Sequence, residues 1–198
     1  DPRSVCALLK EGSPIRNEVS VTGLVQEDGG WTVICDTASF TAKHVILCGG
    51  AGAEALIRTA GIITDRLQVT SGQISLMPEH TSLSALSKTL NYGGYLIPVR
   101  HQAQICGASF ALSATTDITV EAHHHNLALM PEQLHSLAGD VDEFLGRTSL
   151  RLAVTDRLPL SGQIVPGLSV LSCLGARGLT NALFLADDLV RRLSGRPA

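Results

Sequence analysis

The 198-residue sequence has few aromatic side chains, little charge and no long apolar run. Aromatic residues make up 4%, which disfavours a surface for stacking nucleic-acid bases. The formal net charge of −3 gives no broad positive surface for a phosphate backbone. No apolar run is long enough to span a bilayer, so a membrane is not an expected partner. The chain starts with Asp1 and shows no signal segment, so we expect a fragment or processed product of something longer.

Metal and disulfide chemistry also have little support. The five cysteines are widely spaced, odd in number and without a C-x-x-C pair, which disfavours a disulfide framework and a zinc site and favours a reduced, cytoplasmic setting. His123, His124 and His125 follow one another in a predicted helix, where successive side chains point in different directions and cannot share one ion. We interpret them as a solvated helix face and expect no metal.

Hydrophobic residues make up 44% of the chain, enough for a substantial core. Asp1-Pro2 predicts a helix start, and an apolar run from His44 to Cys48 predicts a strand buried on both faces. Helices are also expected at 53–60, at 120–137 with a break at Pro131, and over the amphipathic segment 179–193. Strands are expected at 19–25, 31–35, 44–48, 67–76, 94–98, 104–110, 149–155 and 168–173. The mixed order favours an α+β fold with a largely antiparallel sheet.

Two glycine-rich turns between a strand and a helix are candidate binding loops. Gly50-x-Gly52-x-x-Ala55 has the arrangement that holds a pyrophosphate on backbone amides, although a tight strand-to-helix turn needing small residues is the favoured interpretation. The segment 173–181 ends a strand and begins the clearest helix, whose N-terminus favours an anionic or electron-rich ring edge. Its alternative is an ordinary glycine turn capped by Thr180.

Arg151 lies near the end of a predicted strand. Its planar guanidinium can bind both oxygens of a carboxylate or phosphate, but from the residues alone an exposed strand arginine is the favoured interpretation. No Ser-His-Asp or Cys-His signature accompanies it.

Four segments together carry a resemblance: NYGGYLIP (91–98), ICGASF (105–110), TDRLPLSG (155–162) and LGARGLTNA (174–182). In this order the chain resembles the FAD-dependent amine oxidoreductases of the D-amino-acid oxidase and glycine oxidase superfamily. It is most similar to tRNA-modifying members whose oxidoreductase module is fused to a methyltransferase domain.

The resemblance implies a partial Rossmann-like FAD domain interleaved with a mostly antiparallel substrate-binding sheet. Residues 1–65 and 156–198 would belong to the FAD domain, and 66–155 to the substrate domain. The family's N-terminal βαβ unit, with the true pyrophosphate loop, would precede Asp1 as an absent partner segment. The loop at 49–54 would then lie near the adenosine half of FAD.

The resemblance also implies residue roles. Arg151 would bind the substrate carboxylate between Tyr92 and Tyr95, although Ser149 replaces the glycine usual two positions before this arginine. The backbone of Val21 would meet the adenine. On the ribose side, the resemblance implies contacts of FAD with Cys48 and Gly49. The residues implied to face the flavin are Gly175, Arg177, Gly178, Leu179 and Thr180. Arg177 would also belong to the catalytic residues.

The implied reaction is the oxidation of a carboxymethylamino group to a primary amine and glyoxylate, with FAD as cofactor and a tRNA wobble uridine as substrate. Two alternatives stay open. The protein could be a small-molecule amine or D-amino-acid oxidase, or a truncated, non-catalytic remnant unable to hold FAD.

Overall fold

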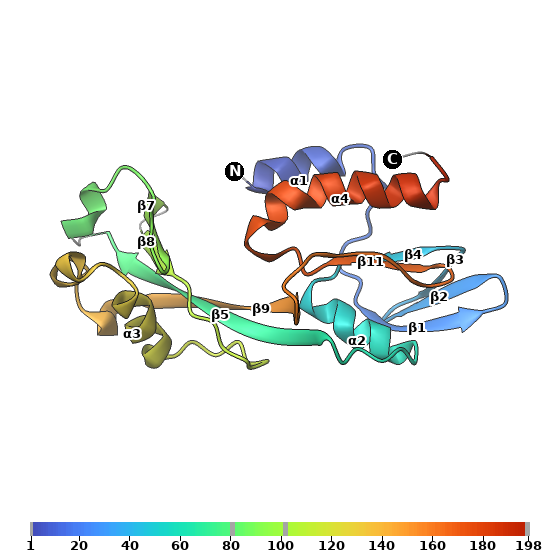
Figure 1. Ribbon diagram of the computed structural model, residues 1–198, viewed down its shortest axis with the longest axis horizontal. Coiled ribbons are helices and arrows are strands. Elements are labelled where there is room, and N and C mark those ends of the chain that lie inside the picture. Colours follow the sequence, from blue (N-terminus) through green and yellow to red (C-terminus); the bar gives the residue numbers. More distant parts are fainter. Residues whose placement is uncertain (1, 80–81, 101–102, 197–198) are drawn as a thin grey trace. The chain divides into compact units, whose positions relative to one another are not determined.

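The computed structural model describes residues 2–79, 82–100 and 103–196 and divides the chain into two units (Figure 1). Unit 1 comprises Asp1–Gln68 and Leu152–Ala198, and unit 2 is the inserted segment Val69–Arg151. The expected division at 65/66 and 155/156 has the same three-part order, with boundaries a few residues away. The predicted α+β class with antiparallel sheets is confirmed. Among the described residues, no helix is long and apolar enough to cross a membrane.

The described residues of unit 1 form two three-stranded sheets, three α-helices and the 3-10 turn Gly175–Arg177. One sheet is a meander of β1 (Val21–Glu27), β2 (Gly30–Cys35) and β3 (Ser39–Ala42). The other has the order β10-β11-β4, and its β11 pairs parallel to β4. These strands are β4 (Val45–Leu47), β10 (Leu160–Val165) and β11 (Leu168–Ser172), and the helices are α1 (Pro2–Lys10), α2 (Ala51–Thr59) and α4 (Gly178–Leu193). Figure 1 shows that α4 lies on one side of the sheet that contains β11, and that α2 lies on the other side of this sheet.

The core of unit 1 joins its two chain segments. Trp31 is 2% exposed, and its indole Nε1 donates a hydrogen bond to the carbonyl of Pro166 at 3.1 Å. The expectation that the strand at 44–48 is buried on both faces is wrong, because Ile46 on the edge strand β4 is 40% exposed. Helix α4 is also more exposed than its apolar face predicts, because Leu189 is the one residue of this helix that is buried.

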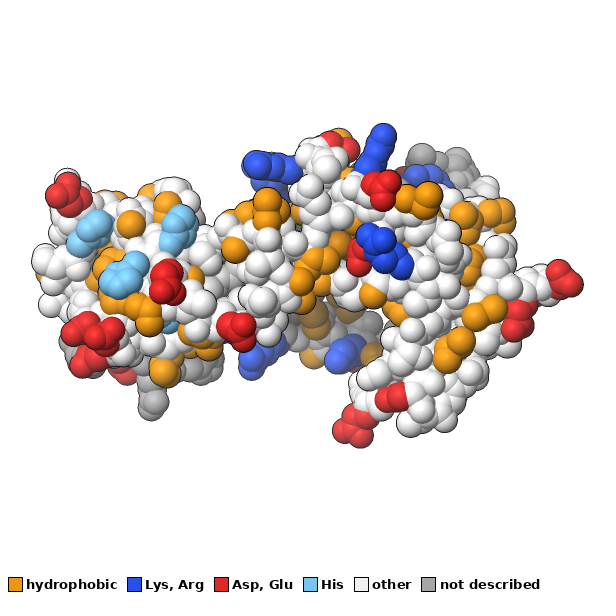
Figure 2. All heavy atoms as spheres, turned by 90° about the horizontal axis from the view of Figure 1, so that it is seen from below, with side chains coloured by type: hydrophobic (Ala, Val, Ile, Leu, Met, Phe, Trp, Pro, Cys, Tyr) orange, Lys and Arg blue, Asp and Glu red, His pale blue; other side chains and the backbone are white. Residues whose placement is uncertain are grey.

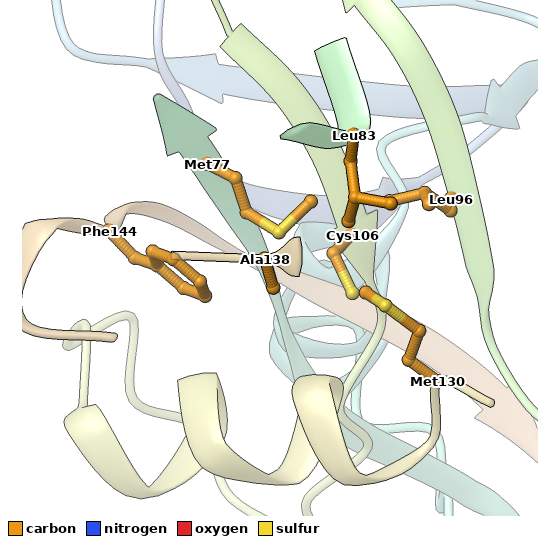
Figure 3. Packing of buried hydrophobic residues seen from close by; sticks show 7 residues of the cluster. All are labelled: Met77, Leu83, Leu96, Cys106, Met130, Ala138 and Phe144. Atoms are coloured by element: carbon orange, nitrogen blue, oxygen red, sulfur yellow. The ribbon is translucent and has the colours of Figure 1, made fainter. Parts of the chain in front are cut away.

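Unit 2 is built on one five-stranded sheet of order β6-β7-β8-β5-β9. Its strands are β5 (Leu67–Pro78), β6 (Leu90–Asn91), β7 (Tyr95–Arg100), β8 (Ala103–Gly107) and β9 (Leu145–Val154). The helix α3 (Val120–Ala128) and the 3-10 turns Ser82–Ala85, Glu132–Leu137 and Val141–Glu143 complete the unit. A break in the helical pattern at Pro131 is confirmed. The buried core consists of Met77, Leu83, Leu96, Cys106, Met130, Ala138 and Phe144 (Figure 3).

A buried polar cluster ties α3 to β5. Ser75 Oγ lies 2.7 Å from Nδ1 of His123 and accepts a hydrogen bond from Asn126 Nδ2 at 3.1 Å. The interpretation of all three histidines as solvated is therefore wrong for His123, which is 3% exposed. Positions 123 and 126 share the helix face that packs on the sheet, whereas His124 and His125 are exposed. Figure 2 shows histidine side chains on the surface of the unit that carries α3.

Candidate functional site

Of the predicted substrate residues of unit 2, Arg151 lies near the end of β9. Its side chain is half-buried, and Cζ lies 5.8 Å from the centre of the Phe110 ring, within reach of a cation–π interaction. Beneath it, on the neighbouring strand β5, lies Gly72, where a Cβ would overlap the guanidinium. No described residue ion-pairs with Arg151 or accepts a hydrogen bond from it. The guanidinium is therefore a partly desolvated cation with free donors.

Tyr95 belongs to the same group of residues. It pairs with Gly107 on β8, and a Cβ at Gly107 would lie 3.2 Å from the Tyr95 hydroxyl. Burial raises the pKa of Tyr95, and the positive charge of Arg151 partly opposes this rise. The phenol is therefore neutral at physiological pH and can donate a hydrogen bond, but it cannot act as a general base there.

The structure places the hydroxyl of Tyr92 differently. It lies 3.6 Å from Sγ of Cys106, and the ring packs against the core of unit 2. Burial, with a further contribution from the Cys106 contact, raises the pKa of Tyr92 well above its usual value. Of the two tyrosines, only Tyr95 interacts electrostatically with Arg151.

A second group of predicted residues lies in unit 1, at the carboxyl ends of the parallel strands β4 and β11. A cavity of about 230 Å³ opens there, and its lining includes Cys48, Gly50, Cys173 and Gly175. The helices α2 and α4 begin beside it, and no side chain caps either N-terminus. Ligands of open α/β sheets bind at such strand ends, and the two helix dipoles favour negative charge.

The predicted cofactor residues are not all in this cavity. Gly49 sits between Cys48 and Gly50 in the loop that lines it, and burial raises the pKa of the Cys48 thiol. Arg177 is the N-cap of α4, and its guanidinium, like the first-turn residues of that helix, is outside the lining. Those first-turn residues are Gly178, Leu179 and Thr180. Val21 starts β1 and does not line the cavity either.

The cavity is compatible with one end of FAD, the cofactor that the resemblance implies. Gly50 and Gly175 have φ values of 58° and 64°, and a Cβ at either would meet no atom within 4 Å, so their backbone is open to a ligand. The volume is below the roughly 300–1,000 Å³ of sites that enclose a drug-sized ligand. The described residues therefore suit a charged or electron-rich part of the cofactor and leave the remainder to other contacts.

A larger cavity of about 660 Å³ lies elsewhere in unit 1, between the end of α2 and β10. Its walls are mainly apolar, and none of the predicted site residues lines it. The buried Ser161 Oγ in its lining has no hydrogen-bond partner among the described residues.

Sequence reasoning missed Gly72 and Gly107, which lie under Arg151 and Tyr95 in the sheet. The available signal was a glycine inside each predicted strand, a position that often marks close approach of another group to the backbone.

Comparison with known proteins decides the family. The model of the family described as DAO, FAD dependent oxidoreductase, matches residues 4–192. The chain belongs to the FAD-dependent oxidoreductase family. FAD is the cofactor of this family, which the resemblance predicted.

Curated relatives of this family member are tRNA 5-methylaminomethyl-2-thiouridine biosynthesis bifunctional proteins MnmC. The protein of Aeromonas hydrophila is 28% identical over 208 residues, covering 89% of this chain and 31% of the relative. That of Caulobacter vibrioides is 32% identical over 179 residues, covering 87% and 28%. The chain thus spans about a third of the length of these relatives.

Solved structures show the same fold. Glycine oxidase from Geobacillus kaustophilus matches with a TM-score of 0.72 and 19% identity, over 94% of this chain and 51% of that protein. Iminodiacetate oxidase (IdaA) from Chelativorans sp. BNC1 matches with a TM-score of 0.71 and 22% identity, over 98% and 53%. The predicted fold of an FAD-dependent oxidase is confirmed, and the chain spans about half of each solved neighbour.

Proposed function

We propose that this chain forms part of an FAD-dependent enzyme that oxidises a carboxymethylamino group, with Arg151 binding the carboxylate. The observation that carries the proposal is the unpaired guanidinium of Arg151, half-buried on a sheet and grouped with the neutral phenol of Tyr95. A planar guanidinium with two free N–H edges matches a carboxylate in a bidentate arrangement.

The names of the relatives agree with this substrate class. Glycine and iminodiacetate, named in the two solved neighbours, each contain an amino group joined through one CH₂ to a carboxylate. The MnmC proteins are named for synthesis of a modified tRNA uridine. We therefore infer a carboxymethylaminomethyl-uridine of tRNA as substrate. A small free amino acid is the second candidate, because the net charge is −3 and, on the face shown in Figure 2, Lys and Arg lie scattered among acidic side chains.

In this proposal the residues of the chain bind and orient, and bound FAD supplies the hydride acceptor for the C–H bond beside the nitrogen. Arg151 fixes the carboxylate, so the adjacent CH₂ has a defined position. Tyr95 donates a hydrogen bond and, because its pKa is raised, takes no proton from the amine at neutral pH. Loss of a hydride from carbon and a proton from nitrogen gives an imine, which water hydrolyses to a primary amine and glyoxylate.

The cavity at the ends of β4 and β11 supports the cofactor role of unit 1 in this proposal. The uncapped start of α4 places a partial positive charge beside Gly175, where it would stabilise negative charge on a reduced ring edge.

The deciding experiment uses the full-length gene product that carries this sequence. Glyoxylate release is measured with tRNA bearing carboxymethylaminomethyl-uridine and with iminodiacetate, and pyruvate release is measured with D-alanine. Preference for the tRNA supports the full proposal, and preference for iminodiacetate retains the substrate class but replaces the tRNA. Exclusive activity on D-alanine, or no activity with bound flavin, overturns it.

A further inference from the structure

We propose that Gly72 is a positioning residue for the substrate carboxylate: the bare backbone at this point of β5 gives the Arg151 guanidinium a flat support. This inference rests on the proposed function, because it concerns the residue there assigned to the carboxylate. It adds a determinant on a different strand, a glycine that has no polar side chain of its own.

The contact between Gly72 and Arg151 is face-on. A Cβ at Gly72 would overlap Cζ, Nη1 and Nη2 of the guanidinium at nearly equal separations. Within the guanidinium plane, the point that is equally far from these three atoms lies much closer to them than the Cβ would. The Cβ would therefore lie above the plane and not in it. The Cβ direction of Gly72 therefore meets the flat side of the guanidinium, and the N–H edges point along the sheet surface.

The second neighbour of the guanidinium also leaves its donors free. Cζ lies 5.8 Å from the centre of the Phe110 ring, and an aromatic ring accepts a cation without taking up its in-plane N–H groups. No described carboxylate or carbonyl accepts from Arg151. The contacts with Gly72 and Phe110 thus hold the guanidinium and leave free the N–H donors that a carboxylate needs.

A side chain at position 72 would act by steric displacement. The backbone of Gly72 lies outside the left-handed region, so alanine can adopt its conformation without strain. Gly72 is itself buried, and a close-packed sheet leaves the new methyl group no other space. The guanidinium must therefore move off the sheet, carrying its carboxylate-binding edge with it.

The test compares Gly72→Ala, Arg151→Ala and the double variant in the full-length gene product. Calorimetry measures the affinity for iminodiacetate, and flavin content is measured in parallel. We expect Gly72→Ala to weaken binding on the order of 10- to 100-fold, with flavin content unchanged. In the Arg151→Ala background, the same substitution has no further effect. Gly93→Ala is the control, because a Cβ there meets only Leu129 Cδ2 at 3.6 Å, an ordinary contact.

A rescue experiment separates positioning from general damage to the sheet. Lysine at position 151 lacks the flat group that overlaps a Cβ at position 72. We expect Gly72→Ala to change iminodiacetate affinity less than about twofold in an Arg151→Lys background. If Gly72→Ala alone fails to fold, recovery of the fold in Gly72→Ala/Arg151→Lys supports the inference, and continued misfolding overturns it.

The failures of the two proposals are distinguishable. If Arg151→Ala lowers affinity and Gly72→Ala does not, the inference is wrong and the proposed carboxylate site stands. If wild-type protein binds neither iminodiacetate nor the modified tRNA, or if Arg151→Ala binds the preferred one of the two as well as wild type does, the proposed site fails and the inference with it.

Discussion

Ser75 Oγ lies 2.7 Å from Nδ1 of His123, and this buried contact joins β5 to α3 on the helix-covered side of the sheet. Burial lowers the pKa of His123, with a smaller contribution from His124. The folded protein therefore keeps a neutral imidazole at a pH where the unfolded chain, with an ordinary histidine pKa of 6.5, already binds a proton. Stability from this group is present above that pH and is lost as the pH falls through the folded-state pKa.

Replacing His123 with glutamine should weaken unit 2 and reduce its sensitivity to acid. We expect a loss of about 1–3 kcal/mol at pH 7.5, because the Ser75 hydroxyl loses its buried imidazole partner. The measurement is the rate of thiol labelling at Cys106, which is 1% exposed in the core of unit 2. His124→Gln is the matched control on the exposed face of α3. Equal labelling of both variants from pH 5 to 7.5 would contradict the assignment.

The fluorescence of Trp31 provides an independent reading of unit 1. It is the single tryptophan of the chain and lies in unit 1, 2% exposed. His123→Gln should accelerate labelling of Cys106 and leave the Trp31 unfolding transition near its wild-type position. A parallel shift of both probes would show that the two units unfold as one.

FAD should bind the 198-residue chain weakly, because the cavity of about 230 Å³ at β4 and β11 fits only part of the cofactor. Gel filtration with measurement of bound flavin tests this. Supplying the family's N-terminal FAD-binding segment should raise occupancy. Stoichiometric flavin retained by the 198-residue chain would refute the expectation.

Labelling of Cys48 gives a second test of the cofactor site. Both Cys48 and Cys6 are exposed, but only Cys48 lines the cavity. We expect bound FAD to protect Cys48 from iodoacetamide and to leave Cys6 reactive, as mass spectrometry of the labelled peptides would show. Unchanged labelling at Cys48 in a flavin-loaded protein would place the cofactor elsewhere.

Arg151 substitutions should affect substrate and spare the cofactor. Arg151→Lys keeps the charge but loses the planar fork, so affinity for the carboxymethylamine falls. Arg151→Ala should lose about 2–5 kcal/mol of binding if the ion pair is well desolvated. Turnover and flavin occupancy are measured together in the full-length gene product. Near-normal activity of Arg151→Ala would reduce the residue to an ordinary strand arginine.

Binding of tRNA to the 198-residue chain should be weak and fall with salt, because the net charge is −3 and aromatic residues are few. Filter binding at two salt concentrations measures this. Tight binding at physiological salt would mean that the recognition surface lies within this chain.

The strongly patterned elements were predictable from the sequence. The amphipathic spacing of 179–193 predicted α4, and segments rich in β-forming residues on either side of the turn at 28–30 predicted β1 and β2. Three strands were not predicted: β3, β6 and β10. The first two are short, and β10 contains Gly162 and polar residues that hide its alternation, so its pairing with β11 decides its structure.

Predictability of the site differed by residue. The likeness of whole segments to a family pointed to Arg151, whereas its support by Gly72 depends on strand pairing that one sequence does not reveal. His123 was misinterpreted because three consecutive histidines look like a polar surface. Its spacing of three from Asn126 was the available signal for a shared buried face.

The parallel pair of β4 and β11 has a consequence for synthesis on the ribosome. Val45–Leu47 emerges early, but its partner Leu168–Ser172 follows only after the whole of unit 2. The hydrogen bond from Trp31 to the carbonyl of Pro166 likewise forms only after unit 2 has been synthesised. Unit 2 is continuous in the chain, so it can fold during translation while unit 1 is still incomplete. The exposed early strands of unit 1 are then the segments most in need of protection from aggregation in the nascent protein.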